Sequence, residues 1–311
     1  MSNNKIRMKP FDLALIVVTM NPELEILKRQ FNNVPSKAGI IIVDNNSEES
    51  LLCEVEELSA TKELVLLKNG ENRGLASALN QGCIEAKSRG YSMVLLLDQD
   101  SEPEKGSIGI LLETYNELSN TGQSIGCVGP TLIDVVTGLD LGFHAIVGLE
   151  WKRVFSENGK PIEITSLNGS GTLMSLKLFS ELGGLDDEFF IDHVDTEWSF
   201  RVKNAGYRLF GVPAAVFLHR MGDKSFRFWM FGWKVWPWRS PLRHQYLFRN
   251  AVVLLKRNYA PLVWKFWAVI KLMITFLVHL IFDPLRMKQC KNMLLGIKKG
   301  VRIKYSILSK I

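Results

Sequence analysis

Two carboxylates stand directly after a run of apolar residues typical of a buried strand. Residues 93–97 are all apolar, and Asp98 and Asp100 follow them. Carboxylates at alternate positions where a strand ends can converge on one divalent cation, and Mg²⁺ takes one or two carboxylates together with phosphate oxygens. A D-x-D pair alone is weak evidence in a chain with 12 Asp, and a solvated turn before Pro103 is the alternative.

A second acidic group lies in residues 192–198, "DHVDTEW", where Asp192, Asp195 and Glu197 stand near the start of a helical pattern. One interpretation is a capping box, with Asp192 as the cap and Asp195 reaching back to it. The other is catalytic: beside a metal-bound nucleotide, a carboxylate placed after the cap can take a proton from an attacking hydroxyl.

His219 ends the apolar run 214–219 and is a candidate third metal ligand. Imidazole suits Mn²⁺ better than Mg²⁺. A histidine that simply packs in the core is the commoner case, so the assignment depends on where the fold places this ring.

Polar side chains also follow other apolar runs. Thr19 and Asn21 stand at the end of the first run and Asp44 at the end of the second, while Asn72 and Arg73 lie in a loop before a helical pattern. Open α/β sheets bind ligands beyond the carboxyl ends of their strands. The sequence has neither G-x-G-x-x-G after its first strand nor G-x-x-x-x-G-K-[ST], so a bound diphosphate would have to be held by metal, which argues against a dehydrogenase or a P-loop enzyme.

The elements that must position these groups form an α/β domain. The expected strands are nearly continuous in apolar residues, which is typical of a mostly parallel sheet covered by helices on both faces. They are 13–19, 39–46, 63–69, 92–100 and 125–133. A helix is predicted between the third and fourth, with Gly90 as its cap.

Composition places the chain among folded proteins, because 47% of its 311 residues are apolar and 23% are charged. Its four cysteines have no metal-site or disulfide spacing. The N-terminus lacks the apolar core of a secretory signal, so we expect a cytoplasmic protein.

The charge is unevenly distributed. The net charge is +6, but residues 226–311 hold 17 Lys or Arg and one acid, Asp283. Four of the eight Trp lie in 229–238, and the apolar stretch 264–282 includes Lys265 and Lys271. This mixture predicts a helical region that lies on an anionic membrane surface rather than crossing it. The alternative is a buried helical hairpin with a solvated basic rim; no nucleic-acid-binding motif accompanies the charge, so no nucleic acid partner is expected.

Taken in order, seven segments resemble the inverting, metal-dependent nucleotide-sugar glycosyltransferases of family 2, which have the GT-A fold. The resemblance covers residues 12–250 and is strongest for the bacterial rhamnosyltransferase branch, which takes L-rhamnose from dTDP-L-rhamnose in O-antigen or related polysaccharide assembly. "YLFRN" matches as well. The seven segments are "VVTMNP", "IIVDNNS", "NRGLASALNQG", "LLLDQDS", "NGSGTLMS", "FFIDHVDTEWSFRVKNAGY" and "LHR".

The resemblance implies a role for each matched residue. Asp98 faces the ribose or the metal, Asp100 binds Mg²⁺ or Mn²⁺ with help from His219, and Asp195 takes the position of the catalytic base. Much of the family has Glu where Val194 stands, so Asp192 and Glu197 stay open as bases. The remaining residues contact the nucleoside, shape its pocket or line the sugar site: Thr19, Asn21, Asp44, Asn72, Gly74, Asn80 and Trp198.

We therefore expect a GT-A domain at 1–225 and a basic, membrane-associating helical region at 226–311, peripheral on the inner face of the cell membrane. The implied acceptor is a saccharide on a polyprenyl diphosphate. Three alternatives are a transferase using a UDP- or GDP-sugar, a catalytically silent nucleotide-sugar-binding protein, and a sugar-nucleotide pyrophosphorylase. The last would need a Gly- and Lys/Arg-rich loop after the first strand, which "TMNPELEI" does not supply.

Overall fold

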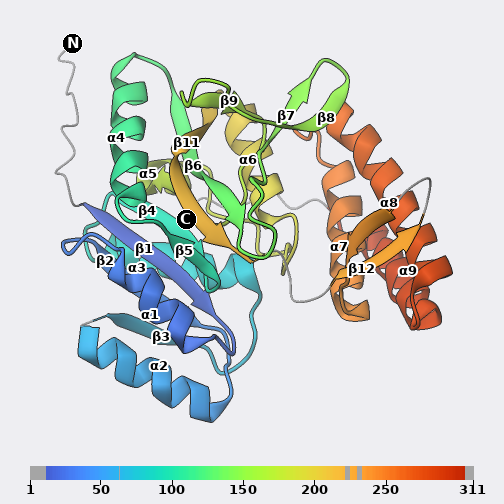
Figure 1. Cartoon of the computed structure of the whole chain (residues 1–311), viewed down its shortest axis with the longest axis horizontal. Coiled ribbons are helices and arrows are strands. Elements are labelled where there is room, and N and C mark those ends of the chain that lie inside the picture. Colours follow the sequence, from blue (N-terminus) through green and yellow to red (C-terminus); the bar gives the residue numbers. More distant parts are fainter. Residues whose placement is uncertain (1–11, 63, 221–224, 230–232, 305–311) are drawn as a thin grey trace.

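A twisted sheet of nine strands forms the centre of the N-terminal part of the chain (Figure 1). The computed structural model describes residues 12–62, 64–220, 225–229 and 233–304, with the backbone alone for 62, 225–229 and 233–237. Along the sheet the order is β3-β2-β1-β4-β10-β6-β11-β5, and β9 pairs with β11. The strands are β1 (Leu13–Thr19), β2 (Gly39–Asp44), β3 (Val65–Lys68), β4 (Met93–Asp98), β5 (Ser101–Pro103), β6 (Ile125–Asp134), β9 (Ile162–Ile164), β10 (Thr172–Ser175) and β11 (Arg208–His219).

Most of this sheet is parallel, as the sequence predicted. β1 pairs in parallel with β2 and β4, β2 with β3, and β6 with β11. The sequence pattern did not reveal β10, which lies antiparallel between β4 and β6. Its four residues follow a Gly-rich loop and are too few to show a period.

Helices cover both faces, which explains why the strands are apolar at every position. In β1, Leu13, Leu15 and Val17 point into one core, and Ala14 and Ile16 into the other. The first core is closed by α1 (Leu24–Asn32), α2 (Glu49–Lys62) and α4 (Ser107–Asn120). The second core is closed by α3 (Leu75–Ser88), α5 (Leu176–Glu181) and α6 (Val194–Asn204).

The helix predicted between β3 and β4 is α3, which lies directly on the sheet. Gly82 permits the close contact, since a Cβ there would come within 2.3 Å of a methyl carbon of Ile16. Gly90, predicted as the cap, follows the helix with φ +84°, a conformation that costs glycine little.

The C-terminal helices form a separate group at one side of the sheet (Figure 1). They are α7 (Pro241–Leu255), α8 (Leu262–Phe282) and α9 (Arg286–Arg302), preceded by an antiparallel pair, β12 (Ser225–Trp229) and β13 (Trp233–Pro237). A second hairpin, β7 (Phe143–Val147) and β8 (Glu150–Val154), reaches over to α8, where Trp267 Nε1 donates to the Leu149 carbonyl at 2.9 Å. Side chains of the Trp-rich stretch 229–237 lie outside the described residues.

The hydrophobic core is continuous across the domain boundary predicted at residue 225. Val253, Leu254 and Trp264 belong to the same buried cluster as the residues of α6. The ring of Trp264 meets that of Phe200 edge to face, with centroids 5.3 Å apart. A chain cut at residue 225 would therefore expose this face of the core to water.

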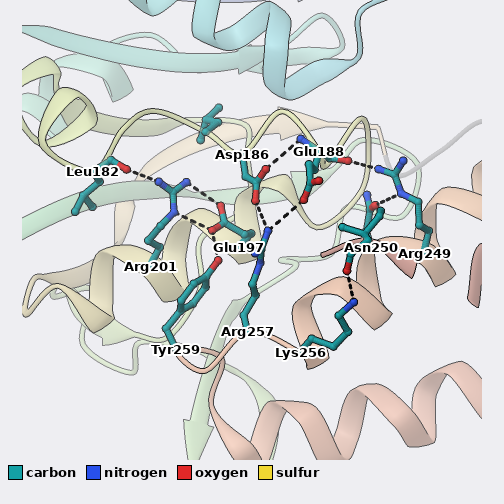
Figure 2. Close-up of polar contacts among 12 residues, drawn as sticks. Leu182, Asp186, Glu188, Glu197, Arg201, Arg249, Asn250, Lys256, Arg257 and Tyr259 are labelled. Carbon is teal, nitrogen blue, oxygen red and sulfur yellow. Dashed lines mark hydrogen bonds and ion pairs between the residues drawn. The ribbon is translucent and has the colours of Figure 1, made fainter. Parts of the chain in front are cut away.

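Buried ion pairs reinforce that junction (Figure 2). Arg257, just after α7, donates to Asp186 at 2.6 Å, and both residues are 3% exposed. Glu197 on α6 is fully buried, binds Arg201 at 2.8 Å and accepts a bond from the Tyr259 hydroxyl at 2.6 Å. The C-terminal region thus supplies Arg257 and Tyr259 to a charged network beneath α6.

Arg257→Met should lower the free energy of unfolding by about 3–5 kcal/mol, because Asp186 would keep a buried carboxylate without its partner. Urea unfolding of the full chain measures the change. Lys68→Met is the matched control: its ion pair with Glu56 is exposed, and its loss should cost less than about 1 kcal/mol. Equal effects of the two substitutions would contradict the structural importance of the buried pair.

Candidate functional site

Three residues of ligand type meet where β4 and β11 end. Asp98 is the last residue of β4, Asp100 lies in the following turn, and His219 ends β11. Because β5 pairs with β11, Ser101 stands opposite His219, and His219 Nδ1 lies 3.7 Å from Asp100 Oδ1. One ligand atom from each of the three lies within 4.8 Å of the others. The three side chains predicted from the sequence as metal ligands are therefore together.

The chemistry of this donor set fits a divalent cation. Burial, and then the charge of Asp100, raises the pKa of Asp98 to about 6. Two carboxylates this close repel each other, and a cation between them would relieve that repulsion. Ser101 Oγ shares a hydrogen bond of 2.6 Å with His219 Nδ1 and so fixes the ring. Carboxylate oxygens with one imidazole nitrogen are acceptable donors for Mg²⁺ and better ones for Mn²⁺.

Asp195 lies in the first turn of α6, close enough to Asp98 that its charge contributes to the raised pKa of that residue. Two backbone amides hold its carboxylate: Thr196 N donates to Oδ1 at 2.7 Å and Gly169 N donates to Oδ2 at 3.2 Å. Burial raises the pKa of Asp195, although these amides oppose the shift. Its carboxylate makes no ion pair with any described residue.

The other two acids of the segment are held by cations. Asp192 binds Arg239 at 2.6 Å and Arg243 at 3.4 Å, and although burial acts to raise its pKa, the two guanidinium groups hold that pKa below the ordinary value. Glu197 is engaged with Arg201 and Tyr259 on the opposite side of α6.

The turn before α6 has an unusual backbone that a buried amide supports. Asp192 and His193 both adopt positive φ, +62° and +64°, which costs non-glycine residues about 1–2 kcal/mol each. Asn250 of α7, 1% exposed, donates to the carbonyls of Ile191 at 2.7 Å and Asp192 at 2.9 Å. This amide therefore fixes the path of the chain into the helix that carries Asp195.

Sequence reasoning gave no role to Asn250, Arg239 or Arg243. "YLFRN" appeared only as a matching segment, without a function for its residues. The available signal was a polar amide in the apolar stretch of α7, where a buried Asn needs partners. Those partners lie 58 and 59 residues earlier in the chain, so local pattern could not identify them.

The residues predicted to contact the nucleoside lie at the ends of β1 and β2. Thr19 and Asp44 are fully buried, and Thr19 Oγ1 donates to Asp44 Oδ2 at 2.9 Å. Ser47 donates to Asp44 through both its amide and its hydroxyl. Asn21 is exposed with φ +50°, and its Oδ1 accepts from Glu48 N at 2.8 Å. Asp44 thus organises the loop here, and nucleoside contact remains a prediction for these residues.

The residues predicted to shape the pocket are divided between two places. Asn72 Oδ1 accepts from Asn45 and from the amide of Gly74, and Gly74 has φ +82°, where a Cβ would meet Phe190. Asn80 lies within α3, apart from these residues: its side chain donates to the Leu185 carbonyl and accepts from the Leu185 amide. Asn80 therefore positions the loop before α6.

Trp198 was expected at the sugar, but its indole lies in the core. It is 3% exposed, packs against Phe179 with ring centroids 6.2 Å apart, and has the Arg201 guanidinium over its ring at 4.9 Å. The physical reason is helical periodicity: Trp198 shares the inward face of α6 with Val194 and Val202. Any effect of Trp198 on the sugar site would act through packing.

A largely parallel sheet that presents a candidate metal site and a carboxylate at the start of a helix is the arrangement expected of a nucleotide-sugar-dependent glycosyltransferase. Residues 15–164 match the family model described as "Glycosyl transferase family 2". The chain thus carries a glycosyltransferase family 2 domain and is a glycosyltransferase. This finding excludes the pyrophosphorylase reading.

Two relatives are rhamnosyltransferases by name. The chain is 29% identical to the dTDP-rhamnosyl transferase RfbF of Shigella flexneri over 94% of its own length and 96% of that protein. It is 26% identical to the N-acetylglucosaminyl-diphospho-decaprenol L-rhamnosyltransferase of Mycobacterium tuberculosis (strain ATCC 25618 / H37Rv), over 69% of this chain and 78% of the relative.

Solved structures share the fold. GalNAc-T7, crystallised with UDP, GalNAc and Mn²⁺, aligns with a TM-score of 0.58 and 17% identity, over 92% of this chain and 56% of that one. The mannosyltransferase PcManGT of Pyrobaculum calidifontis, in complex with GDP-Man and Mn²⁺, aligns with a TM-score of 0.54 and 16% identity, over 95% of this chain and 90% of that one. At such identities the likeness concerns the fold alone.

Asn250→Ala should reduce kcat for sugar transfer by about tenfold or more, because the turn that positions Asp195 loses both donors. Stability should fall by about 1–3 kcal/mol. Donor affinity should not change, since the predicted nucleotide contacts lie on other elements. Steady-state kinetics, donor binding and urea unfolding give the three measurements.

Two further variants make that test specific. Asn250→Asp keeps the size of the side chain but loses both N–H donors, so it should behave like the alanine variant. Asn292→Ala removes a surface amide that bonds to the Lys288 carbonyl of α9 at 2.9 Å, and it should leave kcat intact. An Asn250→Ala enzyme that loses stability but keeps the wild-type kcat would show that this amide has no role in positioning the site.

Proposed function

We propose that the chain transfers L-rhamnose from dTDP-L-rhamnose, with inversion, to a saccharide carried on a polyprenyl diphosphate. The observation that carries the choice of donor is the similarity to the dTDP-rhamnosyl transferase RfbF along nearly the whole of both chains. The decaprenyl-diphosphate-linked acceptor in the name of the mycobacterial relative supports the acceptor class. UDP- and GDP-sugars are the competing donors, and they appear with structural neighbours of much lower identity.

Asp98, Asp100 and His219 would hold a Mg²⁺ or Mn²⁺ ion, with Mn²⁺ favoured by the imidazole donor. When bound, the ion supplies Lewis-acid stabilisation of the negative charge that grows on the departing diphosphate. Ser101 keeps the His219 ring oriented through its hydroxyl.

Asp195 is the proposed base. Its carboxylate takes the proton of an acceptor hydroxyl as the oxygen attacks the anomeric carbon and the bond to the diphosphate breaks. A pKa raised by burial makes this carboxylate a better proton acceptor than an exposed aspartate. Asp192 and Glu197 fit the role less well, because ion pairs with arginine occupy their oxygens.

Asp195→Asn should lower kcat about 100- to 10,000-fold, the usual contribution of a general base. Donor binding should persist. Transfer from dTDP-L-rhamnose by the purified full chain, and thermal shifts with dTDP-, UDP- and GDP-sugars plus Mn²⁺, are the measurements. Asp140→Asn, in the loop before β7, is the matched control.

Two results would contradict these assignments. Unchanged transfer by the Asp195→Asn enzyme would remove Asp195 as the base. Stronger stabilisation by a UDP- or GDP-sugar than by dTDP-L-rhamnose would remove rhamnose as the transferred sugar, because the ligand bound most tightly stabilises the fold most.

We further propose that α8 rests on an anionic membrane surface. By length and composition it is the one described helix that could also cross a bilayer, and 17% of its most apolar window is buried. The inward face of α8, which includes Trp264 and His279, packs against the rest of the protein. This packing favours a helix that lies in the membrane interface over one that crosses the bilayer. The exposed apolar residues of α8 are Leu262, Phe266, Trp267, Val269, Met273, Ile274, Leu277, Leu280, Ile281 and Phe282.

Phe266→Glu combined with Ile281→Glu should weaken binding to anionic vesicles about tenfold or more, because each parent side chain would bury apolar area worth about 1.5–3 kcal/mol. Vesicle flotation measures this. High salt should release only part of the unsubstituted protein. Val136→Glu with Leu139→Glu, two exposed apolar residues near β6, is the control pair. Similar flotation of both double variants would contradict the interfacial role of α8.

A further inference from the structure

Four basic side chains form one group: Arg239 and Arg243 share Asp192, and Lys271 is near enough to Arg239 and Arg153 for their charges to act on it. Arg239 precedes α7, Arg243 lies in its first turn, Lys271 projects from α8, and Arg153 belongs to β8. We call this group the cationic cluster. It joins segments far apart in the sequence, so its existence depends on the tertiary fold.

Direct side-chain contacts hold these segments together. The ring of Trp264 on α8 meets that of His193 edge to face at 5.8 Å, and Trp267 bonds to the β7–β8 turn at Leu149. Lys271 follows Trp264 by two helical turns and therefore lies on the same face of α8. Lys271 is an exposed residue, yet surrounding protein displaces water from its amine and, with the charges of Arg239 and Arg153, lowers its pKa.

The cationic cluster has more positive charge than the protein neutralises. Asp192 pairs with Arg239 and Arg243. Among the described residues, the side chains of Lys271 and Arg153 make no hydrogen bond or ion pair. Two nearby rings, His144 and His193, stay neutral at pH 7, because burial lowers the pKa of each to about 4. Neighbouring positive charges add to the lowering at both rings, and Asp192 opposes it at His193. A site with surplus cations and neutral donors suits a multiply charged anion.

The position of the cluster indicates which anion. On one side Arg239 and Arg243 pair with Asp192, which is only three residues from Asp195. On the other side lies α8, whose outer face exposes Phe266 and Met273. The cationic cluster thus connects the segment that carries the base to the helix that carries the apolar surface. A lipid-linked saccharide has the same covalent order of sugar, diphosphate and hydrocarbon chain.

We propose that the cationic cluster of Arg153, Arg239, Arg243 and Lys271 binds the diphosphate of a prenyl-linked acceptor, while the prenyl chain lies along α8. This inference rests on the proposed function for its acceptor class. It adds the residues that recognise the anion, and it separates the acceptor phosphates from those of the donor, which belong at Asp98 and Asp100.

Farnesyl diphosphate is a suitable probe because it carries the diphosphate and the apolar chain without any sugar. Binding is measured by calorimetry on the full chain in detergent, with dTDP and Mn²⁺ saturating so that the donor site is filled. Farnesol serves as the neutral comparison. We expect the diphosphate to bind about tenfold or more tightly than farnesol, since hydrogen bonds between charged groups are strong.

The variant Lys271→Met with Arg153→Met leaves both partners of Asp192 in place. It should remove most of the preference for farnesyl diphosphate, a loss of about tenfold. The matched control, Lys265→Met with Lys152→Met, removes the same net charge from the same helix and hairpin and should keep the preference within about twofold. Circular dichroism and the unfolding midpoint check that both variants fold.

Three results would overturn the proposal. The first is an equal loss of probe binding in the two double variants, and the second is probe binding that disappears when dTDP is added, which would place the probe in the donor site. The third is a Lys271→Met, Arg153→Met variant that loses binding to phosphatidylglycerol vesicles but still binds the probe, which would make the cluster a site for lipid headgroups. The measurement needs no sugar transfer. If dTDP-L-rhamnose proves not to be the donor while the probe result holds, the donor assignment fails and the cluster stands.

Discussion

The ion pair between Arg257 and Asp186, with the neighbouring contacts of Glu197, is the interaction on which the site depends (Figure 2). Both members of the pair are almost fully buried, so each charge requires the other. The pair ties the segment after α7 to the loop before α6. Without it, the helix that carries Asp195 would lose its connection to the C-terminal helices at this point.

The geometry of α6 explains why neighbouring acids differ in role. Residues two apart on a helix point in directions about 200° apart. Asp195 therefore faces Asp98 while Glu197 faces Arg201 and Tyr259. The carboxylate of Asp195 is held by backbone amides and stays available, whereas that of Glu197 is engaged in structural contacts. The turn at Asp192 and His193, supported by Asn250, sets where the helix begins.

The C-terminal helices consequently do more than extend the chain toward a membrane. They share the hydrophobic core with α6, supply Arg257, Tyr259 and Asn250 to its support, and place Lys271 near the residues around Asp195. Figure 1 shows this group beside the sheet, with the β7–β8 hairpin reaching over to it. The division of the chain at residue 225 describes a change in composition, while packing joins the two parts.

The sequence by itself determined the parallel strands and the acidic pair that ends β4, because continuous apolar runs and the polar residues after them are local patterns. It also singled out His219 and Asp195, though only as candidates. Tertiary structure decided the rest. The pairing of β5 with β11 brought His219 to Asp100, ion pairs engaged Asp192 and Glu197, and packing buried Trp198. Asn250 and Lys271 acquired their neighbours across long sequence separations. Such contacts follow from which faces the core buries, and a local pattern of residues contains no information about that choice.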